Sequence, residues 1–225
     1  MEYEEILYTI EDKLCTITFN NPESMNATST PMREEVMDAM EKAKNDNGAK
    51  VIMFIGAGRA FSAGENLRKL SRRPEGISGD APKVNPIRRI PELFSEIDKP
   101  IVSAVNGAAA GDGFEIVCNS DVRLASERAK FASAYSTVGY IPPCGSMHTL
   151  PRIVGMGNAL DLMWPGKVIN AEEAFRIGLV QYLWPEDEFR DKAKEYCTKL
   201  ANGPLVAINA IKKVAYASQN VESIE

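Results

Sequence analysis

Residues 99–116 read KPIVSAVNGAAAGDGFEI, and this stretch decides the class of fold. Its first part, Ile101–Val105, is a run of apolar and small residues, which is typical of a strand buried on both faces of a parallel sheet. Residues 106–113 are mostly glycine and alanine, and an apolar helical segment begins at Phe114. In open α/β folds ligands bind where such strands end, and the free N–H groups at the start of a helix favour negative charge. The stretch therefore predicts an α/β fold with a ligand site at this junction.

A second junction of the same kind lies earlier in the chain. The apolar run Val51–Ile55 predicts another doubly buried strand, and a loop over residues 56–64 follows it. This loop contains Phe61-Ser62-Ala63-Gly64, whose small residues let a ligand approach the backbone closely. Two peptide N–H groups that converge on one oxygen form an oxyanion hole. Most glycine-rich turns have no such role, so the spacing alone leaves both interpretations open.

The rest of the chain alternates between short strands and helices, as expected for one α/β domain. A hairpin is predicted for residues 6–10 and 14–19, followed by a helix with Thr30 as N-cap and Pro31 at its first position. Residues 71–86 are rich in glycine, proline, serine and charge and are predicted to be a mobile surface segment. The other predicted elements are a helix at 86–97, strands at 122–125 and 130–132, a helix at 171–177 capped by Asn170, a strand at 179–184, and helices at 186–201 and 204–218.

Composition and charge argue against several classes of protein. With 44% hydrophobic and 25% charged residues the chain is ordinary globular protein, and a net charge of −5 gives no support to a nucleic-acid partner. One histidine, His148, and the lack of a Cys-x-x-Cys pair argue against a metal centre. The N-terminus does not resemble a signal peptide, and no apolar run is long enough to span a membrane. We therefore expect a cytoplasmic protein without a membrane partner, with free thiols at Cys15, Cys118, Cys144 and Cys197.

Short motifs along the chain form an ordered set. They are NPESMNA (21–27), FSAGENL (61–67), KPIVSAVNG (99–107), GDGFE (111–115), SDVRLA (120–125), AKF (129–131), LPRIVG (150–155), AEEA (171–174) and GLV (178–180). Each motif alone is weak evidence. In this order the set resembles the crotonase superfamily, also called the enoyl-CoA hydratase/isomerase family, and the resemblance extends from about residue 5 to residue 213.

The resemblance implies a fold, a ligand and an activity. The fold is a crotonase-like spiral of ββα turns at 1–200, followed at 201–225 by the start of a C-terminal helical region whose tail is either short for the family or truncated. The ligand is an acyl-CoA thioester, so that coenzyme A is part of the substrate and no cofactor is covalently bound. The implied assembly is a homotrimer, or a hexamer of two trimers. The implied activity is that of an enoyl-CoA hydratase or isomerase, a lyase or isomerase of fatty acid metabolism.

The resemblance also assigns roles at the two junctions. In the family two backbone N–H groups hold the thioester oxygen, and by position these belong to Ala63 and Asp112, beside Gly111. Because the family usually has glycine in place of Asp112, this carboxylate either points away or takes part in the chemistry. The family's hydratases use two glutamates, of which the first matches Glu115 and the second is replaced by Tyr135. Tyrosine, with a usual pKa of about 10, is a poor base at neutral pH but can donate a hydrogen bond or act as an acid. Glu115 is therefore expected to be the single catalytic carboxylate.

Further residues are implied to contact the substrate, and they are Met25, Ala27, Ala63, Glu65, Asn66, Leu67, Gly111 and Pro143. Glu65 is also a candidate second carboxylate, and Asn66 stands where the family often has aspartate. Pro143 occupies the position at which dehalogenases and dienoyl isomerases of the family carry an aspartate, which disfavours those two activities. A basic run faces either the CoA phosphates or solvent, and it consists of Arg68, Lys69, Arg72, Arg73, Lys83, Arg88 and Arg89.

Three kinds of function remain open at this level. The first is hydration, its reverse, or double-bond isomerisation of an acyl-CoA through an enolate. The second is cleavage by a decarboxylase or hydrolase of the same family, with Tyr135 as proton donor. The third is a catalytically weak acyl-CoA-binding protein, which the loss of the second glutamate and the presence of Asp112 would fit. The retention of Glu115 favours an enzyme.

Overall fold

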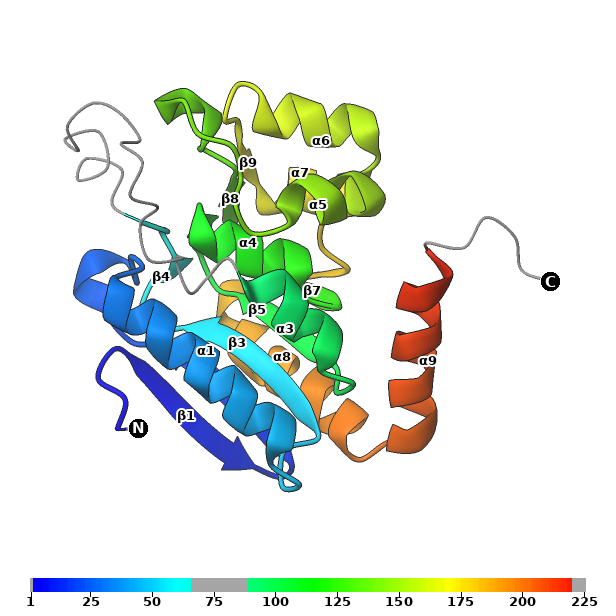
Figure 1. Cartoon of the computed structure of the whole chain (residues 1–225). Helices are drawn as coiled ribbons and strands as arrows, with labels where there is room; N and C mark the ends of the chain where they lie inside the picture. Colours follow the sequence, from blue (N-terminus) through cyan, green and yellow to red (C-terminus); the bar gives the residue numbers. More distant parts are fainter. Residues whose placement is uncertain (1, 66–88, 220–225) are drawn as a thin grey trace, which may run out of the picture.

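The computed structural model describes residues 2–65 and 89–219, and a six-stranded sheet lies at its centre (Figure 1). The strand order is β1 (Ile6–Glu11), β2 (Leu14–Phe19), β3 (Val51–Gly56), β5 (Ile101–Val105), β7 (Val122–Ser126) and β10 (Tyr182–Trp184). β1 and β2 form an antiparallel hairpin, and the other neighbouring pairs in this sheet are parallel. The predicted hairpin and the two predicted buried strands are confirmed.

A second, four-stranded sheet gives the fold its spiral form. Its order is β4 (Ala60–Ser62), β6 (Ala108–Ala110), β8 (Lys130–Ala132) and β9 (Val168–Asn170). The chain places one strand in each sheet in turn, as β3 then β4, β5 then β6, and β7 then β8. Each pair is followed by a helix, namely α3 (Ile90–Glu96), α4 (Asp112–Asn119) and α5 (Ser146–Val154). The predicted α/β architecture of successive ββα turns is confirmed.

The corner between β5 and β6 explains the Asn-Gly pair of the deciding stretch. The side chain of Asn106 accepts a hydrogen bond from the N–H of Gly56 at 2.9 Å and donates one to the carbonyl of Gly58 at 3.1 Å. A Cβ on Gly107 would lie 2.0 Å from the carbonyl oxygen of Arg59, a distance that no side chain tolerates. Glycine therefore lets two neighbouring ββα turns touch, and the asparagine amide holds them together.

Helices cover both faces of the large sheet (Figure 1). On one face α8 (Glu186–Ala201) packs against alternate side chains of β3, which are Val51, Met53 and Ile55. On the other face lie α1 (Thr30–Asn45), α3 and α4, and there Phe54 stacks with Phe19 and with Phe94 at 6.0 Å between ring centroids in each pair. This burial on two faces is why β3 is apolar without alternation.

The remaining elements surround this core. They are η1 (Pro22–Ser24), η3 (Ser136–Val138), α6 (Met156–Met163), α7 (Ala171–Arg176) and α9 (Leu205–Ser218). Asn170 caps α7 as predicted, because its side chain accepts a hydrogen bond from the N–H of Glu173 at 2.9 Å. α9 has no buried side chain and lies at the edge of the molecule (Figure 1). Within the part of the chain that the structure describes, no helix combines the length and apolar character needed to cross a bilayer.

Several local predictions need correction. The N-cap of α1 is Ser29 rather than Thr30, because the Ser29 hydroxyl accepts a hydrogen bond from the N–H of Met32 at 3.0 Å, and Thr30 is already helical. The short strands β4, β6 and β9 were not predicted, since three residues carry no readable alternation. The helix expected at 86–97 is described from Ile90 to Glu96. The segment 71–86, predicted to be mobile, lies outside the described residues.

Candidate active site

The ends of β4 and β6 bring the two glycine-containing junctions into direct contact. β4 and β6 pair in parallel, so that their carboxyl ends meet at one edge of the small sheet. A Cβ on Gly64 would lie 2.5 Å from the carbonyl oxygen of Ala110, and Gly111 has a φ of +50°. Both positions therefore depend on glycine, one for close approach and one for its left-handed backbone. α4 begins at the next residue, Asp112.

Two backbone N–H groups at this contact are candidates to bind an oxygen. Within residues 2–65 and 89–219, neither the N–H of Glu65 nor that of Asp112 donates a hydrogen bond to the protein. Asp112 is the first residue of α4, where a backbone N–H has no partner within the helix. The Glu65 nitrogen lies 3.8 Å from the point that a Cβ on Gly111 would occupy. A small cavity of about 40 Å³ lies here, lined by Ala63, Glu65, Ala110, Gly111, Asp112, Ala134 and Tyr135.

Ala63 lines this cavity but does not supply a donor to it. Its N–H donates to the carbonyl of Met25 at 3.0 Å. The assignment of Ala63 as a thioester donor is therefore wrong, and among the described residues the N–H without a protein acceptor belongs to Glu65, two residues later. Met25 reaches Ala63 through a left-handed turn at residues 25 and 26, whose φ values are both +55°. A sequence motif does not reveal which of several neighbouring N–H groups such a turn occupies.

The carboxylate of Asp112 is turned into a buried polar network. Its Oδ2 accepts hydrogen bonds from Arg33 Nε at 2.9 Å, Arg33 Nη2 at 2.6 Å and Thr28 Oγ1 at 2.7 Å. Its Oδ1 accepts one from Tyr135 Oη at 3.1 Å. Arg33 Nη2 also forms an ion pair with Glu65 Oε2 at 2.9 Å. We call these five residues, Thr28, Arg33, Glu65, Asp112 and Tyr135, the Arg33 network.

Arg33 remains charged despite its burial. Burial lowers the pKa of the Arg33 guanidinium, but the charges and hydrogen bonds of Asp112 and Glu65 outweigh this and raise the pKa above its ordinary value. The side chain of Arg33 is 7% exposed and that of Asp112 is 5% exposed, whereas that of Glu65 is 30% exposed. The Arg33–Asp112 ion pair is thus fully enclosed, and Glu65 connects it to the edge of the cavity.

Tyr135 keeps its proton in this environment. Burial raises the pKa of the Tyr135 phenol well above its usual range, and the nearby charges of Asp112 and Glu115 raise it further. Its hydroxyl donates to Asp112 Oδ1, so that loss of the proton would place a phenolate beside a carboxylate. Of the two roles that the sequence left open for Tyr135, the geometry favours hydrogen-bond donor and disfavours proton donor to a substrate.

Glu115 lies three residues after Asp112 in α4 and is a fully enclosed carboxylate. Its relative exposure is 0%. Its Oε1 accepts a hydrogen bond from Ser146 Oγ at 2.7 Å and its Oε2 accepts one from the N–H of Ser146 at 3.0 Å. Burial raises the pKa of Glu115 to about 7, and the bonds from Ser146 limit the rise, while the charge of Asp112 adds to it. A carboxyl with this pKa can both accept and return a proton at neutral pH.

The other predicted substrate-binding residues are spread around the site. Met25 is 39% exposed, and Ala27 and Pro143 are half-buried. Asn66 and Leu67 lie outside the described residues, as does the basic run except for Arg89. His148 is exposed and contacts Arg152, with 3.0 Å between its Nδ1 and Arg152 Nη1. Among residues 2–65 and 89–219 no cluster of His, Cys, Asp and Glu could hold a metal ion.

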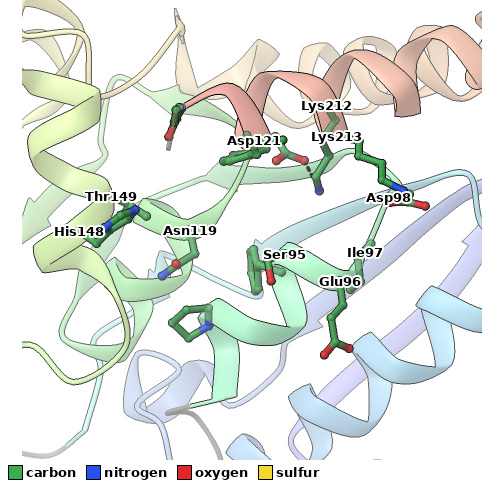
Figure 2. Close-up of a pocket in the computed structure, with 15 residues that line it drawn as sticks. Ser95, Glu96, Ile97, Asp98, Asn119, Asp121, His148, Thr149, Lys212 and Lys213 are labelled. Carbon is green, nitrogen blue, oxygen red and sulfur yellow. Dashed lines mark ion pairs between the residues drawn. The ribbon is translucent and has the colours of Figure 1, made fainter. Parts of the chain in front are cut away.

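A larger cavity, of about 750 Å³, lies away from this site between α3, α5 and α9 (Figure 2). Figure 2 shows the ion pair between Asp121 and Lys212 on its wall, with 2.8 Å between the charged atoms. Asn119, at the last position of α4, also lines it and donates to the carbonyl of Glu115 at 2.7 Å. The large cavity and the small cavity therefore lie at opposite ends of α4.

The comparisons with known proteins agree with this fold. The profile of the family described as enoyl-CoA hydratase/isomerase matches residues 9–224. A crotonyl-CoA hydratase from Syntrophomonas wolfei is 32% identical over 96% of this chain and 82% of its own length. A 1,2-epoxyphenylacetyl-CoA isomerase from Escherichia coli is 31% identical over 96% of this chain and 83% of its own length. The crystal structure of an enoyl-CoA hydratase from Bacillus anthracis superposes with a TM-score of 0.89 and 28% identity, over 97% of this chain and 85% of that one.

These matches define a class and then a family. The fold is that of the crotonase superfamily, as the resemblance implied. The chain belongs to the enoyl-CoA hydratase/isomerase family. The prediction of an enzyme of the hydratase/isomerase kind is confirmed.

Sequence reasoning missed three contributors to the site, Thr28, Arg33 and Ser146. Arg33 carried a readable signal, because it stands on the apolar stripe of α1 between Met32 and Val36, where a charge requires a partner. Thr28 and Ser146 carried no signal. Thr28 contacts Asp112, which lies 84 positions later in the chain, and Ser146 contacts Glu115, which lies 31 positions earlier.

Proposed function

We propose that this chain binds an acyl-CoA thioester and moves a carbon–carbon double bond of the acyl group, with Glu115 as its single acid–base group. The observation that carries the proposal is the enclosed Glu115 carboxyl, whose pKa is raised to about 7, three residues after a free N–H in the same helix. The N–H groups of Glu65 and Asp112 would hold the thioester oxygen. The relatives named as isomerases and hydratases of CoA thioesters support the substrate class.

The proposed reaction needs one base used twice. Glu115 removes a proton from the acyl chain, and the electron pair is delocalised onto the thioester oxygen, where the two N–H donors stabilise it. The protonated Glu115 then returns the proton to a different carbon of the same conjugated system, which shifts the double bond. Substrate and product have the same composition, and no water or external acid is consumed.

Hydration would require more from this site. A hydratase must activate water and deliver a proton, for which the family's hydratases use two glutamates. Here the second position holds Tyr135, whose hydroxyl is committed to Asp112. Glu65, the other candidate carboxylate, is paired with Arg33. These contacts favour isomerisation over hydration.

The position of Glu115 adds a requirement for substrate entry. The carboxylate does not line the small cavity. The proposal therefore includes an opening of the wall between this cavity and Glu115 when the acyl chain enters. Until then the wall excludes water from the carboxyl, which is the cause of its raised pKa.

One experiment separates these reactions. The protein is mixed with a 3-enoyl-CoA and, separately, with crotonyl-CoA, and the absorbance of the conjugated thioester is followed. Isomerisation increases the absorbance in the first mixture, and hydration decreases it in the second. We expect the first change, its loss in Glu115→Gln, and slow or no hydration. Rapid hydration of crotonyl-CoA without isomerisation of the 3-enoyl substrate would overturn the proposal.

A homotrimeric or hexameric assembly remains a proposal of the same kind. Exposed apolar side chains on α9 support it, because Val206 is 89% exposed, Ile211 68% and Val214 66%. Light scattering coupled to size-exclusion chromatography measures the mass directly. A monomeric mass at micromolar concentration would contradict the assembly.

A further inference from the structure

Arg33 contacts the side chains of both residues that contribute a free N–H to the small cavity. Its Nη2 lies 2.9 Å from Glu65 Oε2 and 2.6 Å from Asp112 Oδ2, and its Nε donates to the same Asp112 oxygen. Glu65 follows β4, Asp112 opens α4, and Arg33 lies on α1, so that one guanidinium joins three separate segments. A buried charge of this kind is costly unless its partners are well placed, and here each of them is.

The network also accounts for a carboxylate at residue 112, the first position of α4 and one wall of the small cavity. Two carboxylates beside a thioester oxygen that becomes negative would oppose its stabilisation. Arg33 balances one of these charges, and Thr28 and Tyr135 donate further hydrogen bonds to Asp112. The charge of the Asp112 carboxylate is thereby balanced and its side chain is held in the network, while its backbone N–H donates no hydrogen bond to the described residues.

We infer that Arg33 is a positioning residue of the oxyanion hole: it cancels the charge of Asp112 and thereby holds this carboxylate in place beside the Glu65 and Asp112 N–H donors. Arg33 does not touch the substrate and acts through these two residues. The inference deepens the proposed function and rests on it, since both place the thioester oxygen between the same two donors. Arg33 is thus what allows this chain to combine an aspartate at this position with enolate chemistry.

The first readout is the enolate of acetoacetyl-CoA, which does not require turnover. Its acidic C2 proton leaves to a base, and the enolate absorbs in the near ultraviolet where the keto form does not. The fraction of bound ligand present as enolate therefore reports how well the site holds a thioester oxyanion. The second readout is whether a variant changes kcat or KM, measured with the substrate that the wild-type protein isomerises or hydrates.

The variants are Arg33→Met, Arg33→Lys, Asp112→Asn and the double change of Arg33→Met with Asp112→Asn. Loss of an oxyanion donor lowers kcat by about 100-fold or more, and Arg33→Met should approach this value with KM changed less than about threefold. The enolate fraction should fall in parallel, and Arg33→Lys should give an intermediate result because it keeps the charge but not the fork of donors. Arg190→Met is the matched control, because Arg190 is an exposed arginine of α8 that contacts Gly56 rather than this site.

The double variant separates a positioning role from a purely structural one. If Arg33 acts by cancelling the charge of Asp112, Arg33→Met should lower kcat by less than about tenfold in the Asp112→Asn background. In the background with Asp112 the same change should lower kcat by about 100-fold. An equal loss in both backgrounds, or an unchanged enolate fraction in Arg33→Met, would overturn the inference. If Arg33→Met does not fold, the same comparison is made with the neutral change Arg33→Gln, and the absence of rescue by Asp112→Asn counts against the inference.

The two proposals fail in different ways. If the wild-type protein ionises bound acetoacetyl-CoA in an Arg33-dependent manner but does not isomerise an enoyl-CoA, the proposed reaction is wrong and the role of Arg33 stands. If it isomerises the substrate and Arg33→Met does so equally well, the reaction stands and the role of Arg33 is wrong. If the wild-type protein does not ionise the ligand, the oxyanion hole itself is refuted, and both fail.

Discussion

Replacing Glu115 by glutamine should stabilise the protein at alkaline pH while it abolishes proton transfer. The carboxyl is 0% exposed, and burial raises its pKa from 4.5 to about 7. Between these two values the unfolded chain has lost the proton and the folded chain keeps it, so that stability is fully present below pH 4.5 and falls as pH rises to about 7. A shift of this size corresponds to about 3 kcal/mol.

Glutamine at position 115 removes this titration and keeps the local contacts. Its amide oxygen can accept from the N–H of Ser146, and its NH₂ group can donate to the Ser146 hydroxyl. The difference in unfolding free energy between Glu115→Gln and the wild type should therefore move in favour of glutamine by about 3 kcal/mol between about pH 5 and about pH 8.

Urea unfolding at several pH values, at one protein concentration, measures this difference. The control is Glu34→Gln, the same chemical change on the exposed face of α1. A Glu115→Gln difference that is constant from pH 5 to pH 8 would refute the reasoning, because it would mean that the carboxyl titrates alike in the folded and unfolded chains. In that case Glu115 would also lack the raised pKa on which its role as a base depends.

Three further predictions concern single positions. Ser146→Ala removes a hydrogen bond that favours the charged Glu115 carboxylate, so the acidic limb of the pH–rate profile should move above about pH 7, and an unchanged profile would contradict this. Gly111→Ala places a Cβ at a left-handed residue on the wall of the small cavity, and kcat/KM should fall by at least about tenfold with unfolding free energy reduced by about 1 kcal/mol or more. Glu35→Ala leaves three N–H groups at residues 4–6 without their carboxylate, and urea unfolding should show a loss of about 2 kcal/mol or more with KM unchanged.

The fold was predictable because its signals are local. Buried strands such as Ile101–Val105 are read from continuous apolar runs, and a helix such as α7 from its capping residue Asn170. The strands β4, β6 and β9 were not predictable, because each has three residues and is defined by pairing with distant partners. The order of the short motifs added the ββα arrangement that no single element specifies.

The sequence by itself predicted an α/β protein that resembles the crotonase superfamily, and it proposed a site at two glycine-containing junctions with Asp112 and Glu115 as members. These conclusions depend on residue types and order along the chain, which folding does not change. Only the tertiary structure decided which N–H groups lack an acceptor among the described residues, since the bond from Ala63 to Met25 leaves Glu65 as the candidate donor. It also decided that Asp112 is neutralised, because its partner Arg33 lies 79 residues away in the chain. Contacts at that separation are set by how helices pack on the sheets, and no local pattern contains them.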